Sequence, residues 1–156
     1  MKIPTLTILA AYGLTRGLIV VHVDGLCEPV NPGGTATFGY VIRDNDGSIL
    51  ARRSGIVGKG PAMSNSVAEY AALCEALEFL LRNRRENSSI EVRSDSTLVV
   101  NQMGNNWKFR KGLYREKYQD AVRLRAAFTS LSFRWIPREE NEEADGLTRE
   151  AYRKSI

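Results

Sequence analysis

The sequence has few cysteines and no long apolar run, and each shortage excludes a class of protein. Only Cys27 and Cys74 occur among the 156 residues. Two cysteines are too few for a disulfide framework and are not spaced as metal ligands, so we expect a reducing, cytoplasmic environment. No apolar run approaches the roughly 18 residues that would cross a bilayer, so we expect no membrane association.

Internal repeats and linker-like stretches are also absent, and a length of 156 residues suits one domain. We expect residues 18–156 to form that domain, because a chain of about 150 residues can bury a substantial core. Residues 1–17 combine Lys2 with an apolar stretch but lack a clear small-residue cleavage site. A loosely ordered N-terminal extension, or a start codon placed too early, is therefore expected rather than a secretory leader.

The composition is that of an ordinary globular protein, with 43% hydrophobic and 26% charged residues. Lysine and arginine number 22 against 18 aspartates and glutamates, which gives a net charge of +4. This excess favours a polyanionic partner, although the signal is weak by itself.

Hydrophobic periodicity predicts strands and helices in a mixed order. The predicted strands cover residues 18–23, 35–43, 48–57, 90–93 and 131–135. The predicted helices cover residues 67–84, 96–103, 113–128 and 139–153. The turn residues between the second and third strands indicate an antiparallel hairpin. Strands first, then strands alternating with helices, predict an α/β (α+β) fold with a mixed five-stranded sheet flanked by helices.

Four carboxylates are candidate functional residues, although each one also has an ordinary structural explanation. Asp24 ends an apolar strand, where an unpaired carboxylate is costly, but Asp-Gly is also a common turn former. Glu69 follows Ser66 at the spacing of a capping box. Asp95 stands where a helix N-cap would stand, and Asp145 lies in a charged run typical of a solvated helix face.

Taken together, the four carboxylates indicate a metal site. Asp24 and Asp95 lie where strands end, and the crevice at the carboxyl ends of strands is the usual ligand site of open α/β sheets. Glu69 and Asp145 are on helices that could flank this crevice. Four like charges would repel one another unless divalent cations lay between them. Mg²⁺ suits such a site, because it takes carboxylates, waters and phosphate oxygens as ligands.

Four separated stretches resemble the type 1 ribonuclease H family, and specifically its shorter archaeal and bacterial branch. They are Val23-Asp24-Gly25-Leu26-Cys27-Glu28-Pro29 with Asn31-Pro32-Gly33-Gly34, Asn65-Ser66-Val67-Ala68-Glu69-Tyr70, Ser94-Asp95-Ser96 with Val99 to Met103, and Trp135-Ile136-Pro137-Arg138-Glu139-Glu140-Asn141 leading to Ala144-Asp145. In this order they cover residues 18 to 152.

The resemblance implies a ribonuclease H-like fold with strand order 3-2-1-4-5 and its first three strands antiparallel. It also implies an endonuclease that hydrolyses the RNA strand of RNA–DNA hybrids with two Mg²⁺ ions, for which Mn²⁺ can substitute. The catalytic, metal-binding residues would be Asp24, Glu69, Asp95 and Asp145. We expect a monomer, with double-stranded RNA as a second candidate substrate.

The resemblance further implies a set of substrate-binding residues. The 2′-hydroxyl of RNA would be sensed by neutral donors and acceptors, for which the candidates are the backbone of Gly25, Leu26 and Cys27 together with Asn31, Asn65, Ser66 and Thr97. Ordinary turn and cap roles are an equal explanation for these residues. A basic and aromatic segment, residues 104–125, suits phosphate contacts through Trp107, Lys108 and Arg110, whereas Tyr114 and Tyr118 are expected in the core.

The sequence departs from the family in the loop before the last carboxylate, where many members carry a histidine. Here Arg138 occupies that region. Arginine can hold a phosphate but cannot act as a general acid near neutral pH. The only histidine, His22, shares a strand face with Asp24 and is expected to be a packed core residue.

Two other functions remain open from the sequence. A non-catalytic module of the same fold could bind hybrid or double-stranded RNA, although a binder gains nothing from an anionic cluster that faces phosphates. A DNA-cutting nuclease of the same superfold usually carries additional domains, which 156 residues do not provide.

Overall fold

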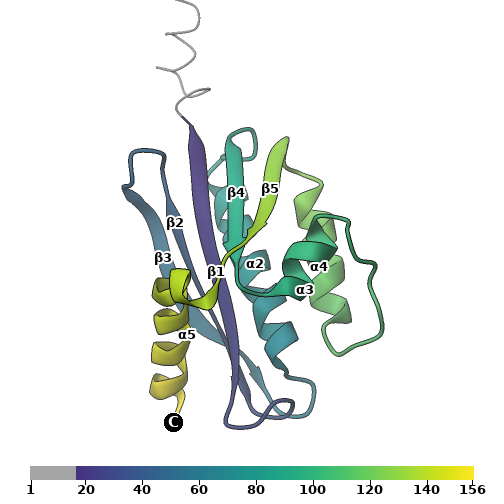
Figure 1. Cartoon of the computed structure of the whole chain (residues 1–156). Coiled ribbons are helices and arrows are strands. Elements are labelled where there is room, and N and C mark those ends of the chain that lie inside the picture. Colours follow the sequence, from purple (N-terminus) through teal and green to yellow (C-terminus); the bar gives the residue numbers. More distant parts are fainter. Residues whose placement is uncertain (1–16) are drawn as a thin grey trace, which may run out of the picture.

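The computed structural model describes residues 17–156 and contains one five-stranded mixed sheet (Figure 1). Its strands are β1 (Leu18–Glu28), β2 (Thr35–Arg43), β3 (Ile49–Lys59), β4 (Ser89–Ser94) and β5 (Ser130–Trp135). The strand order is β3-β2-β1-β4-β5, with β1, β2 and β3 antiparallel and β4 and β5 parallel to β1. The predicted fold class and strand order are confirmed. The expectation for the N-terminal extension lies outside the described residues, Gly17 excepted.

Helices cover both faces of this sheet. They are α2 (Asn65–Arg82), α3 (Thr97–Met103), α4 (Arg115–Arg125), a short 3₁₀ turn η1 (Arg138–Glu140) and α5 (Glu142–Ser155). Helix α2 packs on β1 and β2 with α4 beside it, and α5 packs against β1, β2 and β3 from the other side (Figure 1). The terminal helix therefore starts later than the predicted residue 139, after the separate turn η1.

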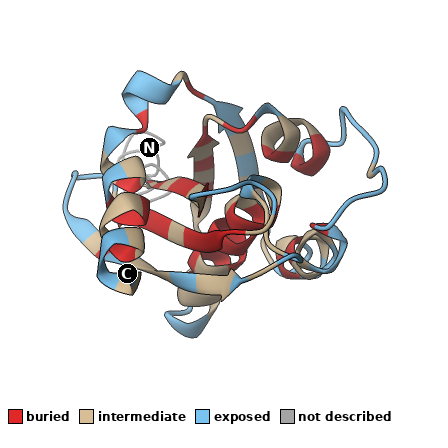
Figure 2. Ribbon diagram, turned by 90° about the horizontal axis from the view of Figure 1, so that it is seen from below, coloured by how far each residue is buried: buried red, intermediate tan, exposed pale blue. Residues whose placement is uncertain are grey.

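The core lies between the sheet and α2, where Figure 2 shows buried residues concentrated. Alternation along β1 sends Ile19, Val21 and Val23 into this core, and all three are at most 2% exposed. The alternate residues His22 and Asp24 consequently face the α5 side. Tyr114 is buried and Tyr118 packs against the core, as predicted.

Two glycines allow the helices to approach the sheet closely. A Cβ atom on Gly25 would lie 2.3 Å from the backbone nitrogen of Glu69 in α2. A Cβ atom on Gly39 in β2 would lie 2.7 Å from the carbonyl oxygen of Ala144 in α5. Both contacts are next to a predicted catalytic carboxylate, so these glycines set how far Glu69 and Asp145 stand from the sheet.

Candidate active site

Asp24 lies inside β1 and does not end it, which corrects the prediction. The strand continues to Glu28 because it pairs with β2 along this whole stretch, with Asp24 opposite Gly39. The parallel strand β4 pairs with β1 only as far as His22 opposite Arg93. Asp24 therefore lies two residues past the last residue of β1 that pairs with β4. Asp95 likewise lies two residues past Arg93 on the neighbouring segment, so the two aspartates stand side by side at this edge of the pairing.

Glu69 does not belong to a capping box, which is a second correction. The helix begins two residues earlier than predicted, and its N-cap is Ser64, whose hydroxyl accepts from the N–H of Val67 at 3.2 Å. Ser66 is thus already inside the helix. Glu69 lies in the second turn of α2, where its carboxylate is available to a ligand.

Asp95 is not the N-cap of α3 either. That role belongs to Ser96, whose Oγ accepts from the N–H of Val99 at 3.2 Å. The main chain of Asp95 is held by Trp135, whose Nε1 donates to its carbonyl at 3.2 Å. Its carboxylate accepts from Nδ2 of Asn141 at 3.2 Å. Asp95 is therefore held by two hydrogen bonds, and neither of its carboxylate oxygens caps the helix.

Asp145 sits in the first turn of α5 on a face that is largely covered by the protein. Its side chain is 25% exposed and its Oδ2 accepts from Nε of Arg149, one turn further along, at 3.1 Å. The alternative explanation, a solvated helix face, therefore does not hold for this member of the acidic run. The i,i+4 spacing of Asp145 and Arg149 was a signal that sequence reasoning missed.

The four carboxylates line one cavity with a volume of about 140 Å³. They come from β1, α2, the end of β4 and α5, so segments far apart in the chain meet here. Four of the predicted substrate-binding residues line the same cavity: Gly25, Leu26, Asn65 and Arg138. The site is thus a small acidic cavity with a guanidinium at its edge.

Asn31 and Cys27 lie beside this cavity and support it. The N–H of Cys27 donates to Oδ1 of Asn65 at 2.8 Å, and the N–H of Asn65 donates to Oδ1 of Asn31 at 2.9 Å. The Cys27 thiol itself is buried at 3% exposure. Because the Asn65 oxygen is used by Cys27, the NH₂ group of Asn65 is the part that remains for a ligand.

Two other predicted substrate residues do not line this cavity. Ser66 is half-buried in the first turn of α2, and Thr97 is exposed as the first residue of α3. Neither is among the residues that surround the carboxylates.

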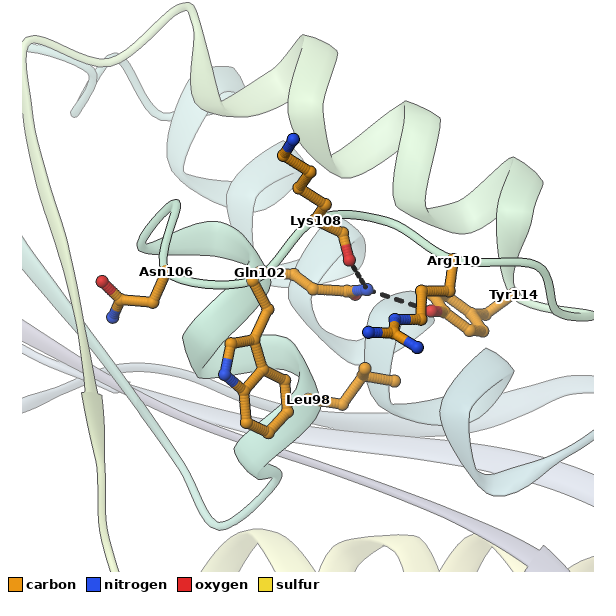
Figure 3. A pocket seen from close by; sticks show the side chains of 7 residues that line it. Leu98, Gln102, Asn106, Lys108, Arg110 and Tyr114 are labelled. Carbon is orange, nitrogen blue, oxygen red and sulfur yellow. Dashed lines mark hydrogen bonds between the residues drawn. The ribbon is translucent and has the colours of Figure 1, made fainter.

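Trp107, Lys108 and Arg110 line a second, separate cavity of about 490 Å³ (Figure 3). Sequence reasoning missed the other lining residues, which are Leu98, Gln102, Asn106 and Tyr114. Gln102 is 2% exposed, and its Nε2 donates to the Lys108 carbonyl at 3.3 Å and to the Tyr114 hydroxyl at 3.0 Å. Its Oε1 accepts from the Tyr70 hydroxyl at 2.5 Å. This buried network ties the basic loop to α2 and α3.

Burial and repulsion between carboxylates raise the pKa values of two acidic residues in this cavity. Burial, with Asp95 and Asp145 nearby, raises the pKa of Asp24 to about 8. Burial also raises the pKa of Glu69 to about 7. In the described part of the chain Asp145 has an ion-pair partner in Arg149, whereas Asp24 and Glu69 have none. Two of the four carboxyl groups therefore have no ion-pair partner among the described residues, and their raised pKa values show how unfavourable their ionisation is in the metal-free cavity.

These residues fit divalent cations, which would supply the missing positive charge. Among residues 17–156, no three histidine, cysteine or acidic side chains are arranged as the ligands of a single ion. Mg²⁺ does not need three, because it keeps several waters and takes one or two carboxylates together with substrate phosphates. The donor set, carboxylates alone, is the one that this hard ion prefers.

His22 is half-buried on the α5 side of the sheet, which agrees with the intermediate burial expected for a packed histidine. Burial and the charges of Arg93 and Arg43 lower its pKa. The histidine is therefore expected to be neutral at pH 7, two residues before Asp24 on the same strand face.

The sheet order, the antiparallel first three strands and the helices on both faces define the ribonuclease H-like fold class. Residues 22–151 match the family model described as reverse transcriptase-like. The crystal structure of RNase H1 from Halobacterium salinarum is similar with a TM-score of 0.77 and 33% identity, over 88% of this chain and 99% of that one. LC11-RNase H1, solved in complex with an RNA/DNA hybrid, gives a TM-score of 0.79 and 35% identity over 88% and 98%.

The chain belongs to the type 1 ribonuclease H family. Among curated proteins, the ribonuclease HI of Halobacterium salinarum is 35% identical over 135 residues, which are 86% of this chain and 64% of that protein. The bifunctional protein Rv2228c of Mycobacterium tuberculosis is 31% identical over 134 residues, only 35% of its length. This chain thus spans about two thirds or less of these curated relatives. No helix between residues 17 and 156 is long and apolar enough to cross a membrane.

Proposed function

We propose that this protein is an endonuclease that hydrolyses the RNA strand of an RNA–DNA hybrid. The observation that carries the proposal is the convergence of Asp24, Glu69, Asp95 and Asp145 on one cavity. Family membership supports the same conclusion, because a relative at 35% identity has been solved with an RNA/DNA hybrid bound. The two remaining candidates, a non-catalytic binding module and a DNA nuclease, become outcomes of the test below.

The four carboxylates would hold two Mg²⁺ ions, with Mn²⁺ as a substitute. When bound, such a pair activates a water on one side of the scissile phosphate and stabilises the leaving oxygen on the other. The protein's part is to bring the four carboxyl groups to one cavity and to aim them at this point. Asp24, whose pKa is raised to about 8 in the metal-free protein, would release its proton when a cation arrives, since metal ligands must be deprotonated.

Neighbouring residues would orient the RNA strand over the carboxylates. Arg138 is permanently charged and lines the cavity, so it can hold a phosphate in place. The NH₂ group of Asn65 and the backbone of Gly25 and Leu26 offer neutral groups at the same cavity. Neutral donors and acceptors are what recognition of a 2′-hydroxyl requires.

The test uses end-labelled RNA–DNA hybrid, duplex RNA and duplex DNA, each incubated with Mg²⁺ or Mn²⁺. We expect fragments of RNA from the hybrid and intact DNA strands. Replacing Asp95 with asparagine should reduce cleavage about 10³-fold, because several kcal/mol of metal-assisted stabilisation are lost. The matched control is Asp120→Asn, an exposed carboxylate of α4 paired with Arg123, which should cut normally.

Each other outcome rejects the proposal in a defined way. Equal cutting by the Asp95→Asn protein would show that the carboxylate cavity is not the catalytic site. Hybrid binding without cleavage in either metal would identify a binding module. Cleavage of duplex DNA in preference to hybrid would identify a DNA nuclease.

The second cavity would bind the phosphate backbone away from the cut. Lys108 and Arg110 line it together with Trp107, which is 49% exposed. Replacing Lys108 or Arg110 with alanine should weaken hybrid binding at every sequence and reduce the slope of log affinity against log salt by about 0.9 per residue, because one fewer counterion is released.

The salt slope is measured by fluorescence anisotropy of a labelled hybrid from 50 to 200 mM salt, a range in which such slopes are typically resolved. Arg82→Ala serves as control, because this exposed arginine stands in the last turn of α2, at the other end of the helix from Glu69. An unchanged slope in the Lys108 and Arg110 variants would remove this cavity from the substrate path.

A further inference from the structure

Asn141 is a buried polar residue between η1 and α5, with an exposure of only 1%. Its Nδ2 atom donates to the carbonyl oxygen of Val23 at 2.9 Å and to Oδ1 of Asp95 at 3.2 Å. The main-chain carbonyl oxygen of Asn141 accepts from the N–H of Asp145 at 3.0 Å. One residue thus contacts the strand that carries Asp24, the carboxylate of Asp95 and the first turn of the helix that carries Asp145.

The orientation of the Asn141 amide is dictated by its partners. The carbonyl of Val23 and the carboxylate of Asp95 are both acceptors, so only the NH₂ group can face them. The Oδ1 atom is then left buried without a hydrogen-bond partner among the described residues. Leaving a buried acceptor unpaired is costly for a fold, so a purely structural role accounts poorly for asparagine here.

We infer that Asn141 is a positioning residue, whose NH₂ group holds the Asp95 carboxylate toward Asp24 so that the pair can share a divalent cation. The inference rests on the proposed function and names a residue that acts through Asp95. Asp24 and Asp95 repel each other when both are ionised, so without the amide the Asp95 side chain would rotate away from Asp24. Trp135 secures only the main chain of Asp95 and cannot prevent this rotation.

The expected consequence is weaker metal binding before any substrate is present. Groups that orient metal ligands typically contribute 10- to 100-fold to metal affinity. The Asn141→Ala protein should therefore bind Mg²⁺ about tenfold more weakly than the parent. A Mg²⁺ titration followed through the backbone amide NMR signals of Gly25 and Ser96 measures this affinity without catalysis, even when binding is weak.

A matched control separates positioning from a general effect on the docking of α5. Thr37 is fully buried, and its hydroxyl donates to the carbonyl of Thr148 in α5 at 3.0 Å. Thr37→Val removes this bond without touching a carboxylate. Both variants should melt at a lower temperature than the parent, but only Asn141→Ala should lose Mg²⁺ affinity.

A double-mutant cycle shows whether Asn141 acts through Asp95. In an Asp95→Ala background, adding Asn141→Ala should change the Mg²⁺ affinity less than twofold. A tenfold loss in that background, or parent-like affinity of Asn141→Ala alone, overturns the inference. If Asn141→Ala does not fold, Asn141→Ser supplies the same comparison, because a serine hydroxyl is too short to reach both acceptors.

The two proposals fail in different ways. A parent protein that binds Mg²⁺ but cuts no hybrid would refute the proposed function alone. A parent that cuts hybrid, together with an Asn141→Ala protein of parent-like Mg²⁺ affinity, would refute the positioning role alone.

Discussion

An Asp24→Asn protein should lose hybrid cleavage about 10³-fold or more, yet be more stable than the parent when both are metal-free at pH 8. The loss of activity follows from removal of a carboxylate that lies at the level of Asp95 and would share a cation with it. The gain in stability follows from the pKa of Asp24, which folding raises from 3.8 to about 8. Asparagine keeps the shape of the side chain and removes the charge.

The sign of the pH effect is set by which state holds the proton. Between pH 4 and pH 8 the folded protein retains a proton on Asp24 that the unfolded chain has released, so the free energy of unfolding falls as the pH rises. Burial likewise raises the pKa of Glu69, and its effect has the same sign up to about pH 7. The asparagine variant should therefore exceed the parent by a margin that grows from pH 5 to pH 8.

Urea unfolding of both proteins with EDTA across this pH range measures the margin. Because folding also lowers the pKa of His22, the stability of both proteins depends on pH through this histidine, and the difference between the two proteins is the informative quantity. Mg²⁺ at pH 8 should stabilise the parent by binding its folded state and should do less for the variant. If the stability difference between the variant and the parent shrinks as the pH rises, the raised pKa of Asp24 is contradicted.

Gly25→Ala should reduce both stability and cleavage, although it adds only one methyl group. The new Cβ would lie 2.3 Å from the carbonyl carbon of Ala68 and from the backbone nitrogen of Glu69. Backbone atoms cannot rotate away, so α2 must move off β1 and carry Glu69 with it. Overpacking of this kind typically costs about 1–3 kcal/mol, and a shift of a catalytic group by about 1 Å can cost 10²-fold in rate.

Gly146→Ala is the matched control, because it makes the same substitution beside another carboxylate. Apart from its chain neighbours and the backbone of its own helix, no atom lies within 4 Å of the Cβ that it would add. Alanine in a helix interior is favoured over glycine by about 0.5–1 kcal/mol, so this variant should be slightly more stable and fully active. Thermal melting and initial rates of hybrid cleavage distinguish the two. Parent-like values for Gly25→Ala would show that α2 does not depend on this close approach.

The elements themselves were predictable because hydrophobic periodicity is a local property. All five strands and the four longer helices were expected with the right type and order. The end of β1 was not, since Asp24-Gly25 resembles a turn and only the long pairing with β2 continues the strand to Glu28. Strand ends depend on partners that are distant in the chain.

Helix starts were ambiguous for a related reason. Ser64 and Ser66 both precede the same apolar pattern, and Asp95 and Ser96 both precede the next one. Each of the four can cap a helix by its own chemistry. The packing of the helices selects Ser64 and Ser96, and this leaves Glu69 and Asp95 for the cavity.

Local patterns in the chain were enough to predict the order of elements, and the resemblance of four separated motifs to one family singled out the four acidic residues that the fold brings together. They could not show that Asp24 is buried beside Asp95 and Asp145, that Gln102 ties the basic loop to α2, or that Asn141 links Val23 to Asp95. Periodicity and turn chemistry act over a few residues, so they can be read along the sequence. Burial, repulsion between charges and buried hydrogen bonds depend on neighbours in space, and those neighbours exist only once the chain has folded.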